Sequence, residues 1–165
     1  MSALAQPERE KFLSKHLRHR LTLLRTLRER KNARHNYQGH GDIYRCVKDS
    51  NLIAVRLMLD FMGLKGELDG STYKLAQNTK RLPDDVKIDD FIGRLLTPAD
   101  VPPSSHRVLA GVYKRADKEL AHLTTVFNDE FNEEDALIEA ATAVEDLFKR
   151  FLYEPLDKQL PQMDA

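Results

Sequence analysis

The sequence predicts an all-α protein in which four long helices and one short helix form an up-down bundle. Apolar residues recur at three- and four-residue steps over long stretches, Pro and Gly separate these stretches, and residues that cap helices stand where they begin. The 165 residues are enough to bury one core, so we expect a single domain over residues 1–165.

The first two long helices are expected on either side of a polar, Gly-containing loop. The first covers about residues 7–34, because Pro7 suits the first helical position and an apolar stripe follows it. The second covers about residues 43–62, with Asp42 as its N-cap and Gly63 at its end, and its apolar residues on nearly all sides indicate the central helix. The stripe of the first helix consists of Phe12, Leu13, Leu17, Leu21, Leu24 and Leu27.

Residues 63–87 contain several Gly, Asn and Pro residues and show no helical period. They predict a long loop, with a weak hairpin around residues 68–76. A short helix is expected next, over residues 90–96 with Asp89 as its cap, before a Thr-Pro break.

The last two long helices are expected after a pair of prolines. One begins at a serine cap, residue 104 or 105, and runs to about residue 126, and the other covers about residues 133–153. Pro155 ends the final helix, and residues 154–165 are expected to form a flexible tail. The final helix has an apolar face of Leu137, Ala140, Ala141, Val144, Leu147, Phe148 and Phe151.

The formal net charge of zero hides an asymmetry along the chain. Residues 1–35 hold ten Lys or Arg and three Asp or Glu, whereas residues 116–165 hold four and thirteen. Two interpretations are open: the basic first helix packs beside the acidic last helix, within the chain or across a dimer, or it presents a basic face to phosphates. The second interpretation makes RNA a candidate partner, contacted by Arg18, Arg20, Arg25, Arg28, Lys31 and Arg34.

Several classes of protein are disfavoured. The chain has no apolar run long enough to span a membrane, no Gly-rich phosphate loop and no zinc-type pairing of cysteines, so we expect no membrane association, no metal and no cofactor. Its single cysteine, Cys46, excludes an internal disulfide, fits a cytoplasmic protein and is expected to be a packed thiol.

One helical segment carries residue types suited to phosphodiester chemistry. Arg115, Glu119 and His122 fall at i, i+4 and i+7, so they share one face of a helix. A guanidinium there would stabilise the charged pentacoordinate phosphate, and an imidazole would exchange a proton with a ribose 2′-hydroxyl or the leaving oxygen without a metal. Glu119, or Asp117 from an adjoining face, would orient the imidazole.

This arrangement resembles the HEPN superfamily, whose ribonuclease members carry Arg-x(4–6)-His. The match is Arg115-x6-His122, and the run over residues 118–124 is similar to the AbiU2-like branch, which is associated with phage defence and toxin–antitoxin pairs. The resemblance implies an all-α bundle, a homodimer in which two motifs meet at one cleft, an RNA substrate and an antitoxin or other protein partner.

Two functions therefore remain open. The first is a metal-independent endoribonuclease in which Arg115 and His122 are the catalytic pair, assisted by Glu119 or Asp117. The second is a non-catalytic helical module that binds a protein partner, in which the same arginine and histidine only form ion pairs at the edge of the bundle.

Overall fold

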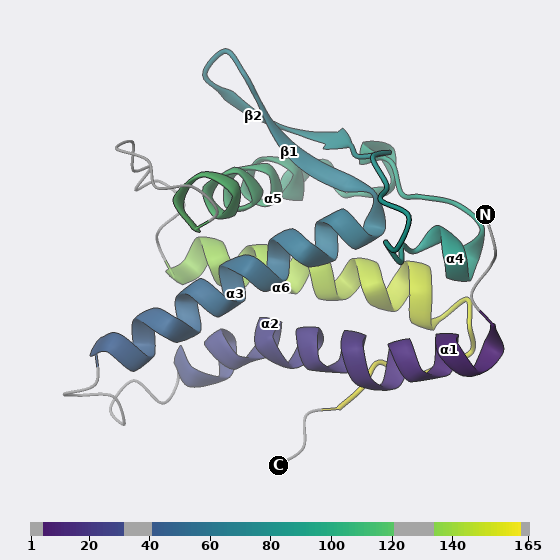
Figure 1. Ribbon diagram of the computed structural model, residues 1–165. Coiled ribbons are helices and arrows are strands. Elements are labelled where there is room, and N and C mark those ends of the chain that lie inside the picture. Colours follow the sequence, from purple (N-terminus) through teal and green to yellow (C-terminus); the bar gives the residue numbers. More distant parts are fainter. Residues whose placement is uncertain (1–4, 32–40, 121–133, 163–165) are drawn as a thin grey trace.

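The computed structural model describes residues 5–31, 41–120 and 134–162. This part of the chain is mostly helical, as expected, but it also contains a small two-stranded antiparallel sheet, so the all-α prediction is wrong in that respect (Figure 1). The helices pack around one hydrophobic core, and the sheet lies against the edge of the bundle.

The N-terminal helical segment is continuous from Gln6 to Lys31. It consists of α1 (Gln6–Lys11), the π-helical stretch η1 (Phe12–Leu17) and α2 (Arg18–Lys31), which confirms the predicted first helix over the described residues. Its predicted stripe faces the core: Phe12 is partly buried, and the other members are fully buried, namely Leu13, Leu17, Leu21, Leu24 and Leu27.

The central helix is α3 (Gly41–Met62), which packs against α2, α5 and α6. It ends at Gly63, whose φ of 82° is left-handed and favours glycine, as predicted. Two predictions at its start are wrong. The helix already includes Gly41, so Asp42 is not its N-cap, and Cys46 is exposed rather than packed because the outer face of this first part of α3 is not covered by the described residues.

The predicted loop over residues 63–87 contains a hairpin, β1 (Leu64–Asp69) paired with β2 (Thr72–Gln77). A hairpin is thus confirmed in this segment. Its first strand begins at Leu64, closer to α3 than the expected range of residues 68–76. Gly66 explains why no strand was expected at residues 64–67. A Cβ atom there would stand 2.3 Å from the carbonyl oxygen of Ala110, so the glycine permits close packing of β1 on α5 instead of breaking the strand.

The short helix α4 (Asp89–Ile92) ends four residues earlier than predicted. Gly93 adopts a left-handed φ of 78° and stops it, and Ile88, not Asp89, occupies the N-cap position. A 3₁₀ turn, η3 (Pro98–Asp100), then leads into the next long helix.

The last two long helices are confirmed where the structure describes them. The first is α5 (Pro103–Arg115), which begins one or two residues before the predicted serine cap and continues as a π-helical stretch, η4 (Ala116–Leu120). The predicted continuation to residue 126 lies outside the described residues. The second is α6 (Glu134–Phe148), which continues as the π-helical stretch η6 (Lys149–Tyr153).

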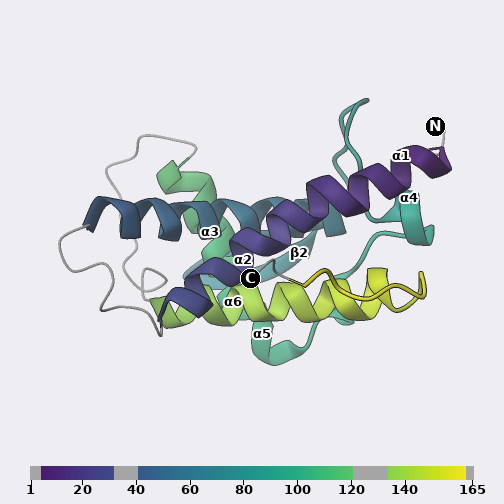
Figure 2. The same ribbon diagram turned by 90° about the horizontal axis from the view of Figure 1, so that it is seen from below.

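The C-terminal segment, which the sequence predicts to be a flexible tail over residues 154–165, is described as far as residue 162. After η6 the chain turns back and returns along α6 toward α2 (Figure 2). Leu156 and Leu160 pack against the core, Lys158 pairs with Glu10 at 3.1 Å, and the carbonyl of Pro161 accepts a hydrogen bond from Arg25.

The basic first helix and the acidic last helix pack together within the chain. Arg25 on α2 is only 9% exposed and donates from Nε to Glu145 on α6, and Arg28 pairs with the same carboxylate at 3.2 Å. Of the two interpretations of the charge asymmetry, packing within the chain is therefore confirmed at this contact. A buried charge is tolerated only when it is paired and hydrogen-bonded, so this contact fixes α2 against α6.

Replacing Glu145 with alanine is expected to lower the free energy of unfolding by about 3 kcal/mol, because it leaves the Arg25 guanidinium buried without its carboxylate. Urea denaturation measures the change. The exposed neighbour provides the matched control, Asp146→Ala, which should change stability by less than about 0.5 kcal/mol. Equal denaturation midpoints for the two variants would contradict a structural role for the Arg25–Glu145 pair.

Candidate functional site

A pocket of ≈ 710 Å³ lies between the N-terminal helical segment, the second half of α3 and the segment that follows β2. Its wall combines apolar and aromatic side chains with charged ones. Phe12, His16 and Arg20 come from the N-terminal segment, and Tyr113 comes from α5. The positively charged side chains outnumber the carboxylates: Arg20, Arg56, Lys65, Lys80 and Lys87 stand against Asp60 and Asp85.

Three of the five cations are held by other groups. Arg56 pairs with Asp117 at 3.2 Å, Lys65 pairs with Glu67 at 2.7 Å, and the buried Lys87 donates to the carbonyl of Asn78 at 3.2 Å. Within residues 5–31, 41–120 and 134–162, no carboxylate pairs with the side chain of Arg20 or Lys80. These two side chains can therefore neutralise an incoming anion without breaking an existing ion pair.

The floor of the pocket is a hydrogen-bonded cluster around Asp60. Its Oδ1 atom accepts from the hydroxyl of Tyr113 at 2.8 Å and from Nδ2 of Asn78 at 2.9 Å. Arg56 approaches the other oxygen at 3.9 Å and lies over the Tyr113 ring, 5.8 Å from its centroid. Burial and the Asp60 charge raise the pKa of Tyr113, so the phenol stays protonated and remains a hydrogen-bond donor.

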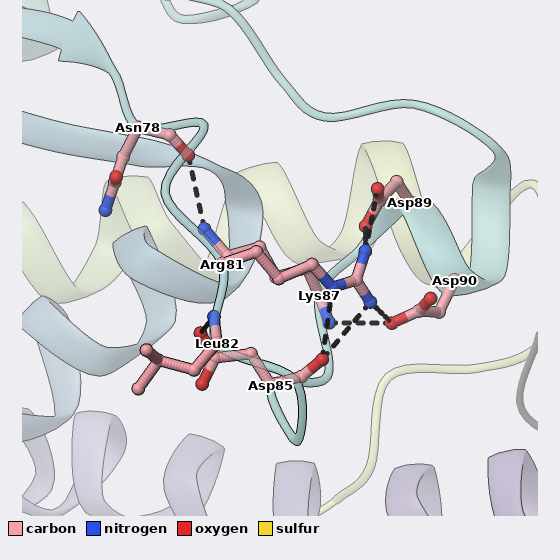
Figure 3. Close-up of polar contacts among 7 residues, drawn as sticks. All are labelled: Asn78, Arg81, Leu82, Asp85, Lys87, Asp89 and Asp90. Carbon is pink, nitrogen blue, oxygen red and sulfur yellow. Dashed lines mark hydrogen bonds and ion pairs between the residues drawn. The ribbon is translucent and has the colours of Figure 1, made fainter. Parts of the chain in front are cut away.

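One wall of the pocket is the segment after β2, and Arg81 holds it in place (Figure 3). The guanidinium donates to both carboxylate oxygens of Asp89 at 3.0 and 3.1 Å, to the carboxylate of Asp90 and to the backbone carbonyl of Asp85. Asp89 and Asp90 therefore hold Arg81 with their carboxylates, although neither is the N-cap of α4. These contacts fix the loop in which Lys80 and Leu82, the two neighbours of Arg81, line the pocket.

Two of the π-helical stretches supply groups to this site. Phe12, His16 and Leu17 of η1 line the pocket, and Asp117 of η4 bonds Arg56 in its wall. Such widened turns change which side chains share a helix face, and they are frequent at functional sites. Their position here is consistent with a functional site.

The predicted catalytic residues are only partly described. Arg115 is the last residue of α5 and lies near α3, where its charge adds to burial in lowering the pKa of Lys48. Both oxygens of Asp117 are engaged, one by Arg56 and the other by Lys114 at 3.4 Å. Asp117 does not itself line the pocket, but it holds Arg56, which does. The side chain of Glu119 and all of His122 lie outside the described residues, so the pairing of Arg115 with His122 stays a prediction.

The predicted nucleic-acid-binding residues do not form one exposed face. Arg25 points inward to Glu145, which corrects its assignment as a phosphate contact, and Arg28 shares that carboxylate. Arg20 faces the pocket, and Arg18 is half-buried. The side chain of Lys31 and all of Arg34 lie outside the described residues.

Sequence reasoning missed the remaining cations of the pocket. Arg56 stands on a helix, Lys65 on a strand, and Lys80 and Lys87 on the loop after β2, and no local spacing connects them. Only the packing of the hairpin and the N-terminal segment around α3 brings them together.

Other kinds of site are not supported in the described part of the chain. No group of three or more His, Cys, Asp or Glu side chains there is placed to hold a metal ion. None of its helices is both long and apolar enough to cross a membrane. Comparison of the chain with protein-family models, with curated proteins and with solved structures found no match.

Replacing Arg81 with methionine is expected to loosen the pocket wall, because Asp85, Asp89 and Asp90 lose their common donor. Amide hydrogen exchange should become at least tenfold faster in residues 80–90, with little change in α2 and α6. The control is Arg94→Met, which removes an exposed guanidinium that pairs with Asp100 outside the pocket. Unchanged exchange in residues 80–90 would show that Arg81 does not fix this wall.

Proposed function

We propose that this protein binds RNA and holds RNA phosphates in the cationic pocket. The observation that carries this proposal is the excess of positive charge in a pocket of ≈ 710 Å³, where Arg20 and Lys80 have no carboxylate partner among the described residues. Guanidinium and ammonium groups are the usual partners of phosphate oxygens, and such contacts do not depend on base sequence.

The composition of the wall favours RNA over a simple inorganic anion. Phe12 and His16 lie beside the cations, with ring centroids 5.5 Å apart. Unpaired bases of single-stranded RNA stack on such rings while neighbouring cations hold the backbone. Both kinds of contact are available in this one pocket.

A second candidate function is the metal-independent endoribonuclease that the resemblance to the HEPN superfamily implies. The observation that favours it is that Arg115 lies close enough to Lys48 for its charge to help lower the pKa of that lysine, in a region that also holds the carboxylates of Asp49 and Glu134. In this candidate Arg115 stabilises the charged phosphate, His122 exchanges the proton and Glu119 orients the imidazole. The homodimer and the protein partner belong to the same proposal.

For RNA binding, the test is fluorescence anisotropy with a labelled single-stranded RNA at several salt concentrations. The double variant Arg20→Gln/Lys80→Gln should weaken binding about tenfold or more at low salt, because each change removes one phosphate contact. The slope of log K against log salt should become shallower by roughly 1.4, since a single strand contributes about 0.7 per phosphate contact.

The matched control for this test carries the same loss of charge elsewhere. Lys149→Gln/Arg150→Gln alters two exposed cations on η6 that do not line the pocket. Its affinity should stay within about twofold of the native protein. The proposal fails if both double variants lose affinity equally, or if the native protein does not bind RNA.

For cleavage, structured and total RNA are incubated with the native protein and with His122→Ala in EDTA. Removal of a general acid or base is expected to reduce a metal-free activity at least a hundredfold. The control is His19→Ala, an exposed histidine that should leave cleavage unchanged. Equal activity of His122→Ala and the native protein would exclude His122 from the chemistry. A native protein that binds RNA without cutting it would be a binding module.

A further inference from the structure

We propose that the pocket takes one unpaired nucleotide, with its base stacked on the Phe12–His16 wall and its phosphate held by Arg20 and Lys80. The ligand class is a nucleoside monophosphate, either free or as part of an RNA strand. The inference rests on the proposed RNA binding and adds which part of the RNA the pocket recognises.

The aromatic wall is suited to stacking because it is braced from behind. The ring of Phe12 stacks on that of Phe61, with centroids 5.8 Å apart and planes at 18°, and Phe61 stacks in turn on Phe148 in the core. His16 lies against Phe12 and is itself exposed. A base that lies on these rings therefore meets a surface held in place by the core, and little ordering is required on binding.

The two cations reach the same pocket from different segments of the chain. Arg20 follows His16 by four residues along the N-terminal segment, and both side chains line the pocket. Lys80 stands on the loop after β2, where its backbone N–H donates to Oδ1 of Asn78 at 3.2 Å and where Arg81 is clamped by its carboxylates. In the proposed complex the phosphate contacts both Arg20 and Lys80, and the attached base lies on the rings of Phe12 and His16, which line the same pocket.

The size of the pocket favours one nucleotide over a helix. A volume of ≈ 710 Å³ lies within the range of pockets that enclose small molecules. A base inside a duplex is stacked on both faces, and only an unpaired or terminal base is free to lie on a side-chain ring. The pocket should therefore bind single strands and strand ends, and reject blunt double-stranded RNA.

The experiment is isothermal titration of the full chain with AMP, adenosine and inorganic phosphate, followed by displacement of labelled single-stranded RNA with AMP. AMP should bind at least tenfold more tightly than adenosine or phosphate, because only AMP uses both the rings and the cations. His16→Ala should weaken AMP binding about tenfold through lost stacking. Arg20→Gln should have an effect of similar size.

The matched control is His19→Ala, because His19 is also exposed on α2 but does not line the pocket. It should leave AMP affinity unchanged. Because both histidines are exposed, neither substitution is expected to unfold the protein. The inference is overturned if AMP binds no more tightly than phosphate, or if the two histidine variants behave alike.

The displacement step separates this inference from the proposed function. RNA that binds but is not displaced by AMP would overturn the single-nucleotide site and leave RNA binding intact. AMP that binds through His16 and Arg20 in a protein without affinity for RNA would support the nucleotide site with a free nucleotide as its ligand, and it would overturn the proposed function.

Discussion

The buried contact between Arg25 and Glu145 is the constraint on which the rest of the arrangement depends. The Arg25 guanidinium is buried, so it needs the Glu145 carboxylate to balance its charge. It also donates a hydrogen bond to the carbonyl of Pro161. The contact therefore ties the N-terminal segment to α6 and to the returning C-terminal segment at once. The N-terminal segment is continuous from Gln6 to Lys31. Fixing it at Arg25 therefore also fixes the turns that carry Phe12, His16 and Arg20 along the pocket.

The basic residues of the N-terminal segment have two different surroundings in the structure. Arg25 and Arg28 are matched by an acidic residue of α6, so part of the basic helix serves packing. Arg20 lies five residues earlier and lines the pocket, to which the loop after β2 adds Lys80 and Lys87. Asp89 and Asp90, the acidic residues nearest to this loop in the sequence after Asp85, pair with Arg81 and do not line the pocket. The pocket is cationic as a consequence of this distribution.

The sequence predicted the long helices and the buried stripe well, because an amphipathic helix encodes its core face in its own spacing. It predicted the inward direction of Arg25 poorly, although a signal was present: Leu21 and Leu24 place Arg25 on the core side of the helix. The strand at Gly66 was missed because a close approach to Ala110 cannot be inferred from local pattern. The pocket could not be predicted at all, since its cations come from segments that meet only through tertiary packing.

Photo-crosslinking tests the central claim most directly, since it reports where RNA lies on the native, unaltered chain. A single-stranded RNA that contains 4-thiouridine is irradiated with the protein, and the modified peptides are identified by mass spectrometry. The account predicts adducts within residues 12–20 and 78–87, the two segments that contribute Phe12, His16, Arg20 and Lys80 to the pocket, and their loss when AMP is present in excess. Adducts confined to other segments, such as α6 or residues 154–162, would contradict it.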